Sequence, residues 1–127
     1  MEWYDALIKP ALNPPSWIFS PVWTVLYIMM AVSAFLVWSK GWKRKEVRIA
    51  LAMFGVQLAL NLIWSPIFFG LQNPLLALVD IILLLAAIIW TVILFYKLSR
   101  PAAYLLIPYL IWVSFATYLN AAIWWLN

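Results

Sequence analysis

The sequence contains no cysteine and no histidine, and only three glycines. Without cysteine the chain has no disulfide and no thiol chemistry. Without histidine it lacks the commonest metal ligand and the commonest general base. The glycines, Gly41, Gly55 and Gly70, stand too far apart to form a phosphate-binding loop. Since no nucleophile–base pair or metal-ligating cluster is recognisable either, we expect no catalytic site, no metal site and no required cofactor.

Charge is also scarce. Of the 127 residues, 9% are charged and 69% are hydrophobic, and the mean hydropathy is +1.01. A soluble domain of this size could not bury so much apolar surface, so the composition indicates an integral membrane protein in contact with the lipid bilayer. The net charge of +4 lies mostly in loops, where it reports membrane topology rather than nucleic-acid binding.

Four long apolar segments predict four transmembrane helices, at about residues 16–38, 47–69, 75–98 and 102–126. Each reaches the length of about 20 residues that a membrane-spanning helix needs. Residues 1–15 read as an amphipathic lead-in that the pair Pro14 and Pro15 ends. The expected fold is all-α, a single integral membrane helical bundle over residues 1–127.

The loops at 39–48 and 97–101 hold seven of the eight lysines and arginines. Because cytoplasmic loops carry the excess of basic residues, we expect both loops in the cytoplasm and both termini outside.

Polar side chains inside the spans need hydrogen-bond partners, because lipid offers none. Gln57 and Asn61 are four residues apart and share a helix face with Trp64. Two interpretations stay open for the two amides: bonds that hold helices together, or groups that line a ligand cavity. Asp80, an acidic residue well inside a span, leaves the same choice between a structural role and a polar pocket.

Several of the ten tryptophans lie inside the spans rather than at their ends. Interior tryptophans usually pack in the core, but rings that share faces with amides can also form an aromatic box for a planar ligand. The candidates, several of them at four-residue spacing, are Trp23 with Tyr27, Trp64, Trp90, and Trp112 with Ala116 and Asn120.

Gly55 and Ala59 form a small-xxx-small step on the second span. They lie about 200° around the helix from the face of Gln57 and Asn61, at 100° per residue. This arrangement favours a homodimer that forms through Gly55 and Ala59.

The order of motifs resembles the tryptophan-rich sensory proteins, bacterial relatives of the mitochondrial translocator protein, or peripheral benzodiazepine receptor. The matching runs are Trp3-Tyr4-Asp5, Pro14-Pro15, Pro21-Val22-Trp23-Thr24, Gln57-Leu58, Asn61, Trp64, Phe68-Phe69, Pro108-Tyr109-Leu110, Trp112, Phe115-Ala116 and Leu119-Asn120. They extend over essentially the whole chain.

The resemblance implies a helical bundle in a bacterial or archaeal cell membrane that binds porphyrin (tetrapyrrole) and has a regulatory or transport-related role. Some family members bind sterols or benzodiazepine-type drugs, and dimers are common. The alternatives are light-dependent porphyrin degradation, with indole rings as electron donors, and small-molecule transport. The expected ligand-binding residues, with Asn120 added from its spacing, are Trp23, Tyr27, Gln57, Asn61, Trp64, Trp112, Phe115, Ala116 and Asn120.

The chain departs from the family pattern in four respects. Members usually have five spans, so either the start of this protein lies upstream or the variant has lost one wall of the bundle. Leu12 stands where many relatives have tryptophan, and Ser20 stands where glycine is common. No basic residue follows Tyr118, which the sterol motif of animal members requires, so cholesterol binding is not expected.

Overall fold

The computed structural model describes residues 16–127, which form four long helices and one short one. The long helices are α2 (Ser16–Trp38), α3 (Lys45–Ser65), α4 (Pro74–Leu98) and α5 (Arg100–Leu126). A π-helix, η1 (Pro66–Gly70), directly follows α3. This confirms the all-α fold and the four spans, while the predicted lead-in at 1–15 lies outside the described residues.

The starts of α4 and α5 follow from their local sequence. The side chain of Asn73 accepts a hydrogen bond of 3.0 Å from the backbone N–H of Leu76, and Pro74 occupies the first helical position. Ser99 similarly caps α5 at Ala102 N, at 3.4 Å. Asparagine and serine are good N-caps, and a proline in the first turn loses no helical hydrogen bond. The turn between α4 and α5 is therefore very short, and the two helices are antiparallel neighbours.

The end of the second span widens into η1 at Pro66. The backbone N–H of Leu71 donates to the carbonyl of Pro66 at 2.9 Å, the five-residue step of a π-helix. In η1 the ring of Phe68 becomes buried and stacks on Trp64 with centroids 4.9 Å apart. The proline thus changes the helix without ending it, and it brings aromatic rings to the end of α3.

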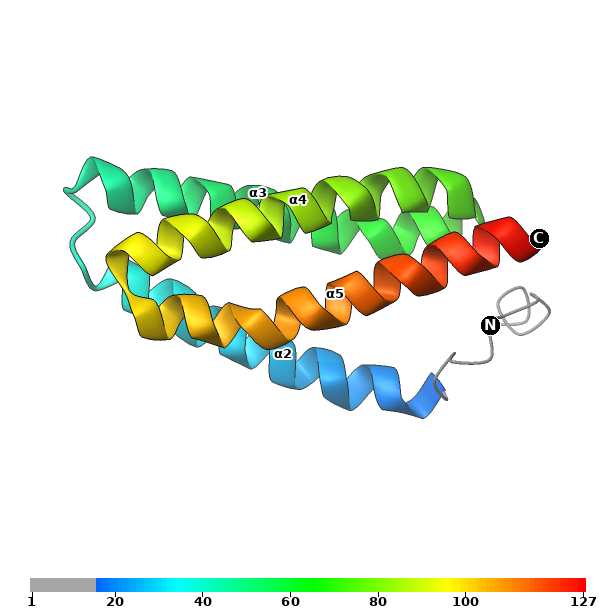
Figure 1. Cartoon of the computed structure of the whole chain (residues 1–127), viewed down its shortest axis with the longest axis horizontal. Helices are drawn as coiled ribbons and strands as arrows, with labels where there is room; N and C mark the ends of the chain where they lie inside the picture. Colours follow the sequence, from blue (N-terminus) through cyan, green and yellow to red (C-terminus); the bar gives the residue numbers. More distant parts are fainter. Residues whose placement is uncertain (1–15) are drawn as a thin grey trace.

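The helices form an elongated bundle in which α4 lies between α3 and α5, and α2 runs along α5 (Figure 1). Ser33 on α2 donates a hydrogen bond of 2.7 Å to the carbonyl of Ala102 on α5. The rings of Phe54 and Phe95 stack between α3 and α4 at 5.8 Å. The buried apolar residues that form the core are Leu26, Met30, Val37, Val47, Ala50, Ile81, Leu84, Ile88, Phe95, Ala102, Ala103, Leu106, Tyr109 and Val113.

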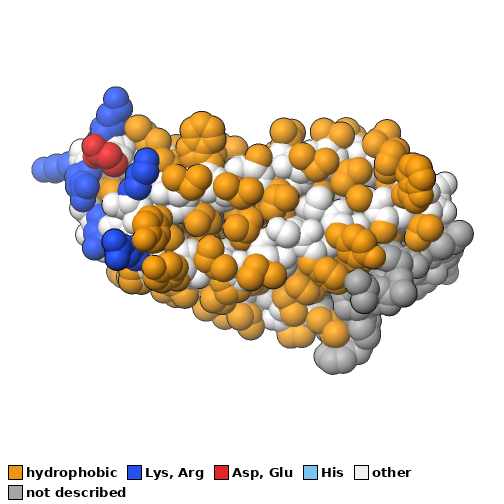
Figure 2. All heavy atoms as spheres, viewed as in Figure 1, with side chains coloured by type: hydrophobic (Ala, Val, Ile, Leu, Met, Phe, Trp, Pro, Cys, Tyr) orange, Lys and Arg blue, Asp and Glu red, His pale blue; other side chains and the backbone are white. Residues whose placement is uncertain are grey.

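Apolar side chains cover the length of the bundle, and lysines and arginines gather at one end (Figure 2). That end holds the α2–α3 loop and the α4–α5 turn, where the guanidinium of Arg100 lies 5.4 Å from the ring centroid of Tyr96. Each of the four long helices is long and apolar enough to cross a membrane. The protein is therefore a multi-pass integral membrane protein.

Candidate functional site

A cavity of about 410 Å³ opens between the helices in the half of the bundle away from the basic loops. Helices α2 and α4 begin in that half, and α3, η1 and α5 end there, so all five elements contribute to its wall. The lining residues are Ser20, Trp23, Tyr27, Asn61, Trp64, Ser65, Phe68, Phe69, Ile81, Leu84, Trp112, Val113, Ala116, Leu119, Asn120 and Ile123.

The helical repeat explains how separate stretches reach one cavity. Side chains at three- and four-residue steps share a helix face. On α2 this step joins Trp23 to Tyr27, on α3 it joins Asn61 to Trp64, and on α5 it joins Trp112 to Ala116. Since each of these stripes faces the bundle interior, rings and amides from three helices meet around the same hollow.

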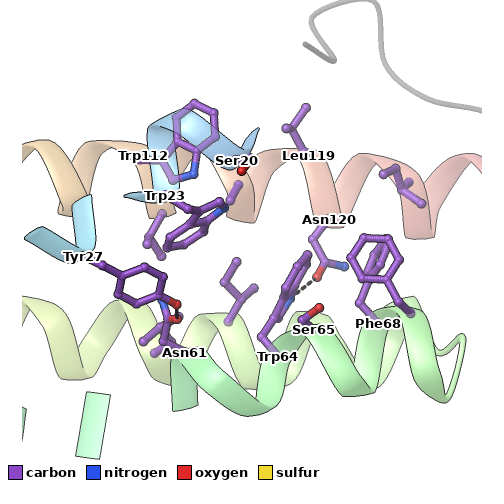
Figure 3. Close-up of a pocket in the computed structure, with 16 residues that line it drawn as sticks. Ser20, Trp23, Tyr27, Asn61, Trp64, Ser65, Phe68, Trp112, Leu119 and Asn120 are labelled. Atoms are coloured by element: carbon purple, nitrogen blue, oxygen red, sulfur yellow. Dashed lines mark hydrogen bonds between the residues drawn. The ribbon is translucent and has the colours of Figure 1, made fainter. Parts of the chain in front are cut away.

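Aromatic rings make up much of the wall. Trp23 lies between Tyr27 and Trp112 in Figure 3. Its ring centroid is 5.7 Å from that of Tyr27 and 6.3 Å from that of Tyr109, which it meets edge-on. Such tilted and edge-to-face pairs are favourable aromatic arrangements. The rings therefore hold one another in place and still leave ring faces along the cavity.

A directional chain of hydrogen bonds joins α2, α3 and α5 beside the cavity. The Tyr27 hydroxyl donates to the Asn61 carbonyl oxygen, and the Asn61 amide donates to the Tyr109 hydroxyl at 2.9 Å. The Tyr109 hydroxyl donates in turn to the Gln57 carbonyl oxygen at 2.7 Å, and the Gln57 amide reaches the Met30 sulfur at 3.9 Å. Both predicted amides thus bond to protein groups in this arrangement.

A second polar cluster ties three elements together at the outer part of the cavity. The Trp64 indole N–H donates to the Asn120 side-chain oxygen at 2.9 Å, drawn as a dashed line in Figure 3. The Asn120 amide then donates to the backbone carbonyl of Pro74 at 2.9 Å. The hydrogen-bonding groups of these two side chains therefore fix α3 and α5 to the start of α4.

The expected site residues do not all line the cavity. Gln57 is buried behind it, in the tyrosine–amide chain. Phe115 is also outside the lining, and its ring lies 5.9 Å from Trp112 and 6.1 Å from Tyr118. Trp90, a candidate for the aromatic box, is 60% exposed on the outer surface of α4 and does not belong to it.

Asp80 is 6% exposed, and its Oδ2 atom has no hydrogen-bond partner among the described residues. Its neighbours Ile81 and Leu84 line the cavity, but Asp80 itself does not. Within residues 16–127 no group of three potential ligating side chains could hold a metal ion. The structure thus gives Asp80 no place in the wall of the pocket.

Tyr109 is the main residue that the site prediction missed, although it lies in the matching run Pro108-Tyr109-Leu110. Its position three residues before Trp112 places it on the same face of α5 and could have indicated its role. Ser20 and Ser65 were also missed, and single serines in a span give no periodic signal that would have revealed them.

Comparison with known proteins gives matches along the whole chain. Residues 1–126 match the TspO/MBR family. The chain is 52% identical over 125 residues to the tryptophan-rich protein TspO of Chlorobaculum tepidum, covering 98% of this chain and 79% of that protein. It is 47% identical over 126 residues to the protein of the same name from Archaeoglobus fulgidus, with coverage of 98% and 80%. It is also 43% identical over 126 residues to the translocator protein of Homo sapiens, with coverage of 98% and 74%.

Removing one hydroxyl should test the structural role of the tyrosine–amide chain. We predict that Tyr109→Phe lowers the free energy of unfolding by about 1–2 kcal/mol, because it leaves an Asn61 donor and a Gln57 acceptor buried without a partner. Thermal unfolding in detergent measures the change. The control is Tyr104→Phe on the same helix. Tyr104 is 58% exposed, so removing its hydroxyl should change the free energy of unfolding very little. Equal stability of both variants and the unmodified protein would contradict the prediction.

Proposed function

Because this chain belongs to the TspO/MBR family, as its motifs indicated, we propose that it binds porphyrin, or a similar planar hydrophobic molecule, in the pocket between its helices. The observation that carries the proposal is the convergence of Trp23, Trp64 and Trp112 on one hollow within the membrane-spanning part of the bundle. Indole rings on three different helices offer flat apolar faces to a flat apolar ligand.

The size and chemistry of the pocket support this proposal. Its volume of about 410 Å³ falls in the range of about 300–1,000 Å³ that is typical of small-molecule sites. The described lining contains no carboxylate, lysine or arginine, and most of its side chains are aromatic or aliphatic. An apolar molecule can therefore enter without leaving a buried charge unpaired. Trp23 and Trp112 would flank the ring system.

We propose a binding role, with regulation or transport as its consequence. Tyr27 is the one lining side chain in the described part of the wall with an ordinary acid–base group, and its hydroxyl already donates to Asn61. General acid–base chemistry needs a group within reach of the proton that it moves. This arrangement favours holding the ligand over transforming it.

The distribution of charge supports an orientation in the membrane. The basic residues of the α2–α3 loop and the α4–α5 turn lie together at one end, and the pocket lies in the other half. Because basic loops stay in the cytoplasm, we propose that the pocket lies in the outer half of the membrane and that the C-terminus is outside.

The surface of α3 supports a homodimer. Gly55 and Ala59 are exposed, and a Cβ atom added at Gly55 would meet nothing within 4 Å. Small residues on a lipid-facing surface let a second helix approach closely. We propose that two copies of the chain pack through this part of α3.

Porphyrin titration tests the binding proposal. We predict that Trp23→Ala and Trp112→Ala each weaken binding about tenfold, because each removes a stacking ring as well as apolar contact area. The shift of porphyrin absorbance in nanodiscs gives the dissociation constant. The control is Trp90→Ala, which removes an indole from the outer surface of α4. If binding never saturates and all three variants leave it unchanged, the porphyrin partitions into lipid and does not occupy a specific site.

Labelling with a membrane-impermeant thiol reagent tests the orientation. The chain has no cysteine, so a single introduced one reports its own position. We predict that Leu71→Cys, in the turn before α4, reacts in intact cells, and that Ser39→Cys, after α2, reacts only after lysis. Both positions are exposed, so accessibility within the protein does not bias the comparison. The opposite pattern would reverse the orientation.

Substitution on α3 tests the dimer. We predict that Gly55→Leu weakens dimerisation about tenfold and leaves the single chain stable, since the added side chain meets open space. Ala86→Leu places the same side chain on the exposed surface of α4 and serves as the control. Single-molecule photobleaching in bilayers measures the dimer fraction. An unchanged fraction in Gly55→Leu would rule out this surface.

A further inference from the structure

Hydroxyl side chains within a membrane usually bond to their own helix, because lipid offers no acceptor. Four serines and threonines in the described part of the chain follow that pattern. The side chains of Thr24, Thr91, Ser114 and Thr117 each donate to the carbonyl four residues earlier, at 2.9, 2.8, 2.8 and 2.8 Å. Ser33 donates to another helix at Ala102, and Ser39 donates to the carbonyl of Leu36.

Ser20 and Ser65 are different. Neither hydroxyl has a hydrogen-bond partner in the part of the chain that the structure describes, although a carbonyl lies one helical turn earlier in each case. Both residues line the pocket, Ser20 on α2 and Ser65 at the end of α3 (Figure 3). Among the described serines and threonines, the two whose hydroxyls have no partner therefore both line the proposed ligand site, on separate helices.

Four other side chains of the wall already have their polar groups in hydrogen bonds. Tyr27 and Asn61 belong to the tyrosine–amide chain, and Trp64 bonds to Asn120. A ligand that reaches the pocket thus meets Ser20 and Ser65 as donors whose hydrogen bonds are still unmade. Under an apolar ligand each hydroxyl can still turn back to the carbonyl one helical turn earlier, so it contributes nothing to the binding of that ligand.

We propose that Ser20 and Ser65 select, among planar hydrophobic ligands, those that carry oxygen acceptors on their rim. Each hydroxyl donates to a carboxylate or carbonyl oxygen of the ligand, while the indole rings hold the flat apolar part. A site that hydrogen-bonds its ligand binds an analogue without the bonding group more weakly. The inference rests on the proposed porphyrin binding.

Three porphyrins separate the contribution of the hydroxyls from that of the rings: protoporphyrin as the free diacid, its dimethyl ester, and octaethylporphyrin, whose rim has only alkyl groups. Dissociation constants are measured for the unmodified protein, Ser20→Ala, Ser65→Ala and the double variant. The control is Ser114→Ala, which removes an exposed hydroxyl that bonds to its own helix at Leu110. The ester arm shows whether a neutral carbonyl suffices or a carboxylate is required.

We expect each single variant to bind the diacid about fivefold more weakly, the effect of one lost hydrogen bond, and the double variant to lose more. Octaethylporphyrin should bind all of these proteins equally, which also shows that the variants are folded. Equal affinity of the double variant and the unmodified protein for the diacid would overturn the inference and leave the proposed function standing. An equal loss for octaethylporphyrin would also overturn it, because the effect would then come from pocket shape. If the unmodified protein bound none of the porphyrins saturably, both proposals would be refuted.

Discussion

Polar groups within a lipid bilayer must find their partners inside the protein, and this constraint determines how the four helices meet. Tyr27, Asn61, Tyr109 and Gln57 satisfy it as a chain in which each member donates to the next. These hydrogen bonds form in only one rotational setting of α2, α3 and α5, because each bond requires a particular face of each helix. Apolar packing alone is less specific in lipid, where the tails are as apolar as the side chains. The aromatic residues on those same faces are consequently brought around one cavity.

The fold was predictable because the hydropathy of four long segments decides it. The predicted boundaries differ from those of α2, α4 and α5 by at most two residues. The exception is the end of the second span, where α3 stops at Ser65 and the π-helix η1 begins at Pro66. A proline without an N–H removes one hydrogen bond, but several backbone geometries accommodate that loss. The rings of Trp64 and Phe68, which stack here, belong to the tertiary contacts that select among them.

The site was predictable only to the level of helix faces. A four-residue spacing places Trp112, Ala116 and Asn120 on one stripe, and all three line the cavity. The same reasoning cannot say how deep along a stripe the hollow extends, which is why Gln57 is buried behind it. Nor does spacing distinguish a ring that faces the interior from one that faces lipid, since both environments are apolar. For this reason Trp90 was a candidate on the same grounds as Trp23, although its ring lies on the outer surface of α4.

The two polar clusters also explain why a cavity persists between helices that pack closely elsewhere. The tyrosine–amide chain holds α2, α3 and α5 together on one side of the hollow, and the bonds from Trp64 through Asn120 to Pro74 hold α3, α5 and α4 on the other. Between them Ala116 contributes only a methyl group to the wall. Hydrogen bonds on both sides of the hollow thus position the helices. The helices keep their separation without side chains that fill the space between the rings. Since those bonds occupy the amides, the Ser20 and Ser65 hydroxyls are the groups that we propose as donors to a ligand. The groups that hold the pocket open are therefore largely separate from those that would recognise its contents.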